Sequence, residues 1–455
     1  MTTHLLSDPA YRRDMGGGLV LRWSGARDAE RIAALYAEVF RRAKDDPPNL
    51  LMAAWTRELM SGRHPLIGAG DFALMENTRD GTIAASTCLI RQTWSYEGIP
   101  LAVGRPEIVG TRDGYRERGL VRAIFELIHA RGAADGQLAQ GITGIPFYYR
   151  QFGYEYAADL GGERYIYFSA IPRLAEGQAE PFVLRDATPA DLPRVLALYD
   201  QDRQRAPVST QLDAEYLRWV LEGQSAEAAE GWRTQLIAGA ADAAAVGYVL
   251  THRRRWGDAL PVLALGFAPG VPLPAALPSV LRALMAQAPG AFAPRPNTPP
   301  PARLSLVLGR EHPAYAALDP MLAATYEAPY AWYVRVPDLP AFVRHVAPAL
   351  ERRLAGSIMA GYSGELRLDF YRGGLRLAFE QGRLRAAEPW NARAVAWGPK
   401  PNGGFPPLVF LQLLFGHRSL SELRYAFPDV WAEEEARPAL EALFPSRPAW
   451  VLPLD

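Results

Sequence analysis

The stretch from Glu107 to Arg131 places glycine and arginine residues directly before a helix, a pattern suited to binding an anion. It reads EIVGTRDGYRERGLVRAIFELIHAR, and Arg116-Glu-Arg-Gly119 leads into apolar residues at helical spacing. The first backbone N–H groups of a helix are unpaired and partly positive, and glycine lets an anion approach them closely. Arginines add charge-assisted hydrogen bonds. The stretch therefore predicts a pyrophosphate site, with an ordinary solvated basic helix start as the alternative.

The elements that must position this loop belong to a repeat. Residues 19–36 read LVLRWSGARDAERIAALY, and residues 182–199 read FVLRDATPADLPRVLALY. Each copy shows a short apolar strand, a polar turn and apolar positions at helical spacing. Arg22, Asp28 and Tyr36 all recur 163 residues later. The repeat predicts a duplicated α/β domain, and two unrelated strand–helix units are the alternative.

The pattern changes after residue 337. Residues 338–354 predict one amphipathic helix capped by Asp338, and residues 364–387 predict three short strands joined by glycine-containing hairpin turns. Helical patterns follow at 405–415, 419–426 and 433–444. Residues 161–180 read as a last strand and a polar linker. We therefore expect three domains, covering residues 1–170, 181–337 and 338–455.

Composition narrows the classes of function. Lys and Arg number 49, as do Asp and Glu, so no bulk field attracts nucleic acid or an anionic membrane. No apolar run approaches the length of a membrane span, and the single cysteine, Cys88, suits a reducing compartment. The histidines show no spacing typical of a metal site. We expect a soluble cytoplasmic protein that uses no metal, nucleic acid or membrane.

Two motifs in the first copy resemble those of a known family. Arg116-Glu-Arg-Gly119-Leu-Val121 resembles motif A of the GNAT (GCN5-related) N-acetyltransferases, Arg/Gln-x-x-Gly-x-Gly/Ala, except that Val121 replaces a small residue. That replacement is similar to the enhanced intracellular survival subgroup. In residues 147–154, Tyr149 precedes Phe-Gly-Tyr by three residues, as in the segment after strand 5 of the family. Residues 405–455 look like the sterol-carrier-like domain of that subgroup.

The resemblance implies the fold and the bound cosubstrate. The fold would be α/β (α+β): a catalytic GNAT domain, a degenerate second copy without Arg-x-x-Gly and therefore without a nucleotide, and a sterol-carrier-like domain. Pro106 and Gly110 suit the irregular, bulged strand against which the family binds coenzyme A. The residues implied to bind acetyl-CoA run along that strand, the helix start and the end of the next strand: Val109, Gly110, Thr111, Arg116, Glu117, Arg118, Gly119, Leu120, Val121, Arg122, Gly144 and Ile145.

The resemblance also implies an N-acetyltransferase that transfers acetyl to a primary amine by direct attack in a ternary complex. Tyr149 would protonate the departing thiolate, and its alternative is a packed aromatic residue. The base would be either Glu107 or the terminal carboxylate of Asp455, and neither is preferred. Glu107 has the alternative of a structural pair with Arg105, and the apolar tail before Asp455 has the alternative of disorder.

Two further expectations depend on the resemblance. The subgroup implies a homo-hexamer, with a dimer or trimer as the fallback. A non-catalytic protein that binds an apolar ligand in the third domain, beside a vestigial acetyltransferase site, is the alternative function. Aminoglycosides, polyamines, peptides and lysine side chains all remain open as the amine.

Overall fold

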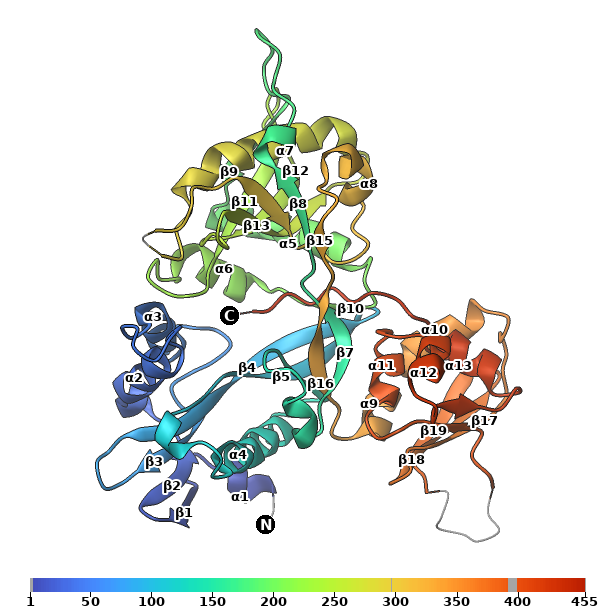
Figure 1. Ribbon diagram of the computed structural model, residues 1–455. Coiled ribbons are helices and arrows are strands. Elements are labelled where there is room, and N and C mark those ends of the chain that lie inside the picture. Colours follow the sequence, from blue (N-terminus) through green and yellow to red (C-terminus); the bar gives the residue numbers. More distant parts are fainter. Residues whose placement is uncertain (1–2, 296, 392–398, 455) are drawn as a thin grey trace.

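The computed structural model describes residues 3–295, 297–391 and 399–454, and these form three units, each built on its own sheet (Figure 1). Helices and strands are mixed in every unit, and the first two sheets combine parallel and antiparallel pairs. The expected α/β class is therefore confirmed.

The first unit is built on a sheet with the order β1-β2-β3-β4-β5-β6-β16-β7, and β10 pairs with β4. Its strands are β1 (Arg12–Gly16), β2 (Leu19–Trp23), β3 (Phe72–Asn77), β4 (Ile83–Tyr96), β5 (Ile99–Thr111), β6 (Ala139–Ile142), β7 (Glu155–Leu160), β10 (Val208–Thr210) and β16 (Tyr330–Arg335). The helices are α1 (Thr3–Ser7), α2 (Ala29–Val39), α3 (Leu50–Leu59) and α4 (Leu120–Ala134). The expected apolar face of α4, which includes Leu120, Ile124 and Leu127, is buried against the sheet.

The second unit is built on a sheet with the order β15-β8-β14-β13-β12-β11-β9. Its strands are β8 (Glu163–Tyr167), β9 (Phe182–Asp186), β11 (Trp232–Gly239), β12 (Ala245–His252), β13 (Ala259–Phe267), β14 (Arg303–Leu306) and β15 (Tyr326–Glu327). The helices are α5 (Leu192–Arg203), α6 (Ala214–Glu222), α7 (Leu273–Gln287) and α8 (Ala314–Leu318). The path β9-β11-β12-β13-β14 has the same succession of strands and helices as β2-β3-β4-β5-β6 in the first unit.

Matching residues of the sequence repeat make matching contacts. Arg22 donates two hydrogen bonds of 2.7 Å to Asp28, and Arg185 donates two of 2.7 Å to Asp191. Each aspartate also accepts a 2.9 Å bond from the backbone N–H three residues earlier, which closes the turn into the helix. The same chemistry therefore fixes the strand-to-helix turn in both units.

Two strands cross the domain boundaries expected from the sequence. β8 lies within residues 1–170 but pairs with β14 and β15 in the second sheet. β16 lies within residues 181–337 but is inserted between β6 and β7 of the first sheet. The strand expected in 161–180 therefore exists but completes the second unit, and residues 330–335 complete the first.

The third unit contains the three expected hairpin strands. Its sheet has the order β19-β18-β17-β20-β21. The elements are β17 (Gly364–Asp369), β18 (Gly374–Glu380), β19 (Arg383–Pro389), β20 (Gly403–Gly404), β21 (Trp431–Ala432), α9 (Leu339–His345), α10 (Ala347–Ala355), α11 (Phe410–Leu414), α12 (Leu420–Ala426) and α13 (Arg437–Leu443). Buried leucine and phenylalanine side chains fill the space between this sheet and its helices.

The single helix expected over 338–354 is wrong, because the segment forms two helices that meet at Val346. Pro348 explains the break, since it has no N–H to donate and its ring clashes with the carbonyl four residues earlier. The expected cap is correct: the Asp338 carboxylate accepts a 2.9 Å hydrogen bond from the Ala341 N–H.

The C-terminal segment runs between the units as an extended, buried strip. Trp450 pairs with Ser209, and its N–H donates a 2.8 Å hydrogen bond to the Val208 carbonyl. Trp450, Leu452 and Leu454 pack into the core of the second unit, whereas Ala449 and Val451 pack into the core shared by the first and third. The expected buried tail is thus confirmed up to Leu454. Asp455 lies outside the described residues.

Candidate active site

Strands β5 and β6 separate from one another and leave a gap in the first sheet. They are parallel, and they pair only at Val103 with Ala139 and at Gly104 with Gln140. Beyond these pairs β5 continues to Thr111, and β6 ends at Ile142. A ligand that lies in such a gap can bond to the backbone of the strand edges, so the splay makes this part of the sheet a candidate binding site.

A bulge in β5 produces this divergence. Between the pairs Cys88–Glu107 and Ser86–Gly110, two residues of β5 oppose the single Thr87 of β4. Ile108 is one of the two, and its φ of 51° is costly for a β-branched side chain. The expected irregular strand is therefore confirmed, and the extra residue falls between Pro106 and Gly110.

A cavity of about 630 Å³ opens beside the bulged strand and the start of α4. Val109, Thr111, Arg116, Glu117, Gly119, Leu120, Val121, Arg122 and Ile145 line it, all of which were predicted from the sequence. Val39, Phe40, Tyr115, Tyr148, Gln151 and Phe152 also line it, and sequence reasoning missed their part in the site. For Tyr148 and Phe152, the only signal in the sequence was the cluster of tyrosine and phenylalanine residues after β6.

Three of the residues predicted to bind acetyl-CoA lie outside this lining, as do the predicted catalytic residues Glu107 and Tyr149. Gly110 is turned toward α2, because a Cβ there would come within 3.0 Å of the Tyr36 ring. The Arg118 guanidinium lies 5.4 Å from the centre of the Tyr115 ring. Gly144 has a φ of 112°, a conformation that side chains rarely adopt, at the turn that follows β6.

The start of α4 presents unpaired backbone donors to this cavity. Gly119 has a φ of 73° and precedes the helix, and the first helical bond is from Ala123 N–H to the Gly119 carbonyl. The N–H groups of Leu120, Val121 and Arg122 therefore have no partner within the helix. Glu117, with a φ of 62°, adds a second left-handed residue to the loop. Such a loop can hold a pyrophosphate through main-chain donors and the positive helix end.

Tyr149 lies in a short 3-10 turn, η3 (Tyr149–Phe152), and is almost fully buried. Its ring packs against Phe125 at 5.9 Å and against Tyr333 at 5.4 Å. Burial raises the pKa of this phenol, and the negative charge of Glu107 raises it further. Among the described residues no group bonds to its hydroxyl. Tyr149 is thus a protonated phenol with its proton still available.

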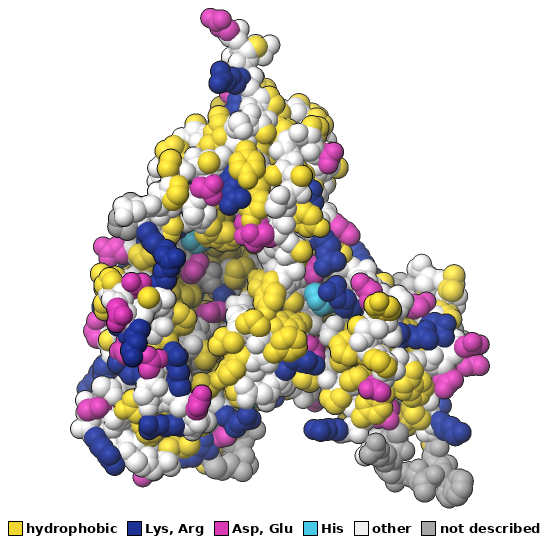
Figure 2. Space-filling model, viewed as in Figure 1, with side chains coloured by type: hydrophobic (Ala, Val, Ile, Leu, Met, Phe, Trp, Pro, Cys, Tyr) yellow, Lys and Arg dark blue, Asp and Glu magenta, His cyan; other side chains and the backbone are white. Residues whose placement is uncertain are grey.

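Glu107 is paired with Arg105, as the alternative interpretation expected. The Glu107 Oε2 atom lies 2.6 Å from Arg105 Nη2, and the arginine side chain is almost fully buried. The same guanidinium donates through Nη1 to the Leu454 carbonyl at 2.9 Å. One cation therefore contacts both Glu107 and the residue that precedes Asp455. Figure 2 shows a hollow between the first and second units, and the C-terminal end of the chain leads to it (Figures 1 and 2).

Strand β16, which follows the second unit in the sequence but pairs within the first sheet, supplies residues that the sequence motifs did not indicate. The Tyr333 hydroxyl lies 3.1 Å from the Ile145 carbonyl and 2.6 Å from the Tyr156 hydroxyl. Tyr156 in turn accepts a 3.0 Å hydrogen bond from the Phe147 N–H. These two phenols hold the loop between β6 and Tyr149 at two backbone points.

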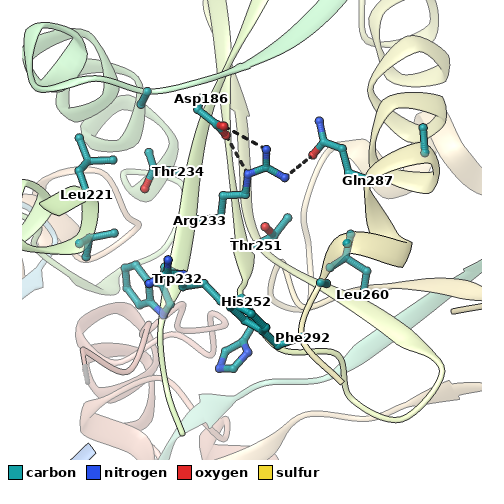
Figure 3. A pocket seen from close by; sticks show the side chains of 16 residues that line it. Asp186, Leu221, Trp232, Arg233, Thr234, Thr251, His252, Leu260, Gln287 and Phe292 are labelled. Carbon is teal, nitrogen blue, oxygen red and sulfur yellow. Dashed lines mark hydrogen bonds and ion pairs between the residues drawn. The ribbon is translucent and has the colours of Figure 1, made fainter. Parts of the chain in front are cut away.

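A second large cavity, of about 610 Å³, lies in the second unit (Figure 3). The Arg233 side chain crosses it, with bonds of 2.8 Å to Asp186 and 3.0 Å to Gln287. Gln287 is the last residue of α7, so this cavity lies at the C-terminal end of that helix, where carbonyl groups are exposed. It therefore lacks the N-terminal donors that characterise the cavity at α4.

Comparisons with known proteins agree with this geometry. Residues 21–157 match a family model described as an acetyltransferase (GNAT) domain. A search of curated protein sequences found no significant match.

The fold as a whole matches solved structures at low sequence identity. A GCN5-related N-acetyltransferase from Kribbella flavida is 16% identical, with a TM-score of 0.65 over 99% of this chain and 100% of that one. One from Anabaena variabilis ATCC 29413 is 14% identical, with a TM-score of 0.64 over 95% and 99%. Eis1 from Mycobacterium abscessus is 14% identical, with a TM-score of 0.58 over 96% and 99%. The chain therefore has their fold along nearly its whole length.

Two absences were found within the described ranges. No group of His, Cys, Asp and Glu there is arranged to hold a metal ion. No helix in that part of the chain is long and apolar enough to cross a bilayer.

Proposed function

We propose that this protein is an acetyl-CoA-dependent N-acetyltransferase, with acetyl-CoA bound in the cavity between β5, the start of α4 and the end of β6. The observation that carries this proposal is the unpaired N–H cluster after Gly119, which opens onto a cavity beside a splayed, bulged strand. The Leu120–Arg122 N–H groups would hold the pyrophosphate. The backbone from Val109 to Thr111 would pair with the pantetheine arm, and Gly144 and Ile145 would border the thioester.

The reaction proposed is a direct transfer to a primary amine in a ternary complex. The amine nitrogen attacks the thioester carbonyl carbon, the carbon–sulfur bond breaks, and Tyr149 gives its proton to the thiolate. A carboxylate accepts the ammonium proton, and Glu107 and the terminal carboxylate of Asp455 are the two candidates. The raised pKa of Tyr149 keeps the phenol protonated at neutral pH, as an acid must be.

Several features of the assembly belong to the proposal. The matching turns at Arg22–Asp28 and Arg185–Asp191 support a duplicated GNAT fold. The second copy would bind no nucleotide, because its large cavity lies at the C-terminal end of α7. The third unit would be a sterol-carrier-like domain that delivers the tail to the site, and its packed interior offers no observation in favour of an apolar ligand. The protein would act in the cytoplasm, where its single buried thiol stays reduced. It would assemble as a homo-hexamer, which sedimentation at micromolar concentration tests.

Calorimetric titration with acetyl-CoA tests the central claim. The native protein should bind one molecule per chain, and Gly119→Asp should abolish binding, because it places a carboxylate where the pyrophosphate would lie. Gly136→Asp is the matched control. Gly136 also has a left-handed φ, of 70°, and also faces open space, but it lies beyond the C-terminal end of α4. Equal affinity in the native protein and Gly119→Asp would reject the site.

A further inference from the structure

The loop between α2 and α3 is built as a fixed turn beside the cavity at α4. The Asn49 N–H donates to the Ala37 carbonyl at 2.7 Å, and the Asn49 side chain donates to the Phe40 carbonyl at 3.1 Å. Within the loop, the Ala43 N–H donates to the Asp46 carboxylate at 3.2 Å. These bonds give the backbone of residues 40–49 a defined shape.

This loop borders a small hollow that is rich in cations. The hollow has a volume of about 210 Å³, and its charged lining residues are Glu38, Arg41, Arg42, Lys44, Asp113 and Arg116. The two acids are already engaged, because Glu38 pairs with Arg112 and Asp113 pairs with Arg116 at 3.0 Å. In the described chain, Arg42 and Lys44 have no ion-pair partner, and both are exposed. The lining of the hollow therefore carries four cations and two carboxylates.

The hollow is continuous with the proposed coenzyme cavity. Val39 and Arg116 line both spaces, so a ligand that leaves the pyrophosphate loop on the α2 side enters the cationic hollow. Coenzyme A continues beyond its pyrophosphate into a ribose that carries a 3′-phosphate. That group is a phosphomonoester with close to two negative charges at neutral pH.

We propose that this hollow is the subsite for the ribose 3′-phosphate of coenzyme A, with Arg42 and Lys44 as its main ligands and Arg41 and Arg116 beside them. The proposal rests on the proposed function, since it needs the pyrophosphate to lie at the start of α4. Guanidinium and ammonium groups bind phosphate oxygens through charge-assisted hydrogen bonds. The protein would therefore discriminate between coenzyme A and coenzymes that lack the 3′-phosphate.

Titration calorimetry with coenzyme A and with 3′-dephospho-coenzyme A tests this subsite without any amine acceptor. The native protein should prefer coenzyme A by about tenfold, the size expected when two or three exposed cations contact one dianion. In the double variant Arg42→Ala/Lys44→Ala, coenzyme A should bind as weakly as the dephospho form, and the affinity for the dephospho form should not change. Raising the salt concentration should reduce the preference in the native protein only.

Arg372→Ala removes an equally exposed cation from the third unit, and it should keep the native preference. Equal affinity of the native protein for both coenzymes would overturn the subsite while leaving the proposed function intact. A preference that survives in Arg42→Ala/Lys44→Ala would overturn the assignment to these residues. Failure of the native protein to bind either coenzyme would overturn the subsite and the proposed function together.

Discussion

Arg105 donates a 2.9 Å hydrogen bond to the carbonyl oxygen of Leu454, across the boundary between the bulged strand and the C-terminal segment. The Gln92 side chain donates to the same carbonyl at 3.0 Å. Because Arg105 is also paired with Glu107, one buried guanidinium contacts both the bulged part of β5 and the tail. The described end of the tail is therefore attached to the bulged strand of the first unit.

Replacing this guanidinium should loosen the tail. Arg105→Gln leaves Glu107 without its cation and removes the bond to Leu454, so the free energy of unfolding should fall by about 3 kcal/mol. Urea titration measures this, and carboxypeptidase should remove the C-terminal residues faster than in the native protein. Arg372→Gln, at an exposed position, serves as the control. An unchanged urea midpoint together with an unchanged rate of digestion would show that the tail is held by its apolar contacts alone.

Removing one hydroxyl tests the proposed acid. Tyr149→Phe keeps the ring contacts with Phe125 and Tyr333, so folding and acetyl-CoA affinity should survive. Turnover with any amine substrate that is found should fall by about 10²–10⁴-fold, the usual contribution of a positioned acid. Steady-state kinetics and calorimetry on the same preparation separate the two effects. Native turnover in this variant would leave Tyr149 as a packing residue.

Two variants distinguish the candidate bases. Glu107→Gln preserves the shape of the side chain but accepts protons poorly. Loss of the low-pH limb of the pH–rate profile, along which the rate rises as the base is deprotonated, in this variant alone would select Glu107. Deletion of Asp455 moves the terminal carboxylate back to Leu454, and reduced but measurable activity there would select the tail. Full activity in both variants would exclude both carboxylates.

Gly110 should tolerate no side chain. A Cβ at this position would lie 3.0 Å from the Tyr36 ring, and Tyr36 is fully buried in α2. Gly110→Ala should therefore lower the free energy of unfolding by roughly 1–3 kcal/mol and weaken acetyl-CoA binding as α2 shifts. Gly114→Ala, where a Cβ meets open space, should change neither quantity. Chemical denaturation and calorimetry provide the comparison.

The second unit should lose stability as the pH falls. Burial lowers the pKa of His312 to about 3. Its Nε2 atom lies 2.8 Å from the Leu265 carbonyl, and its Nδ1 accepts from the Ala314 N–H, so the neutral ring uses both nitrogens. The unfolded chain binds a proton near pH 6.5 and the folded chain does not. From about pH 6.5 down to 3, this residue should therefore cost roughly 1.4 kcal/mol per pH unit.

Thermal unfolding at a series of pH values measures this effect. His312→Gln should show a shallower loss of stability in the same window, because it removes one group that must be neutral in the fold. Parallel curves for the native protein and the variant would contradict the assignment of this pH dependence to His312.

Features that depend on neighbouring residues could be read from the sequence alone. The glycine before α4, the buried face of that helix and the turns at Arg22–Asp28 and Arg185–Asp191 all involve partners a few residues apart. Backbone sterics and helical spacing fix such contacts before any tertiary packing forms. The tail could be identified as buried from its apolar residues alone, although its partners could not.

The tertiary structure decided which distant segments meet. Alternation along a strand shows that one face is buried, but it does not show which strand pairs with it. The insertion of β16 beside β6, which brings Tyr333 to the Ile145 carbonyl, therefore had no signal in the sequence. The same holds for the Arg105–Leu454 bond, which joins residues 349 positions apart. Long-range pairing depends on the free energy of the whole packed arrangement, and no local pattern encodes it.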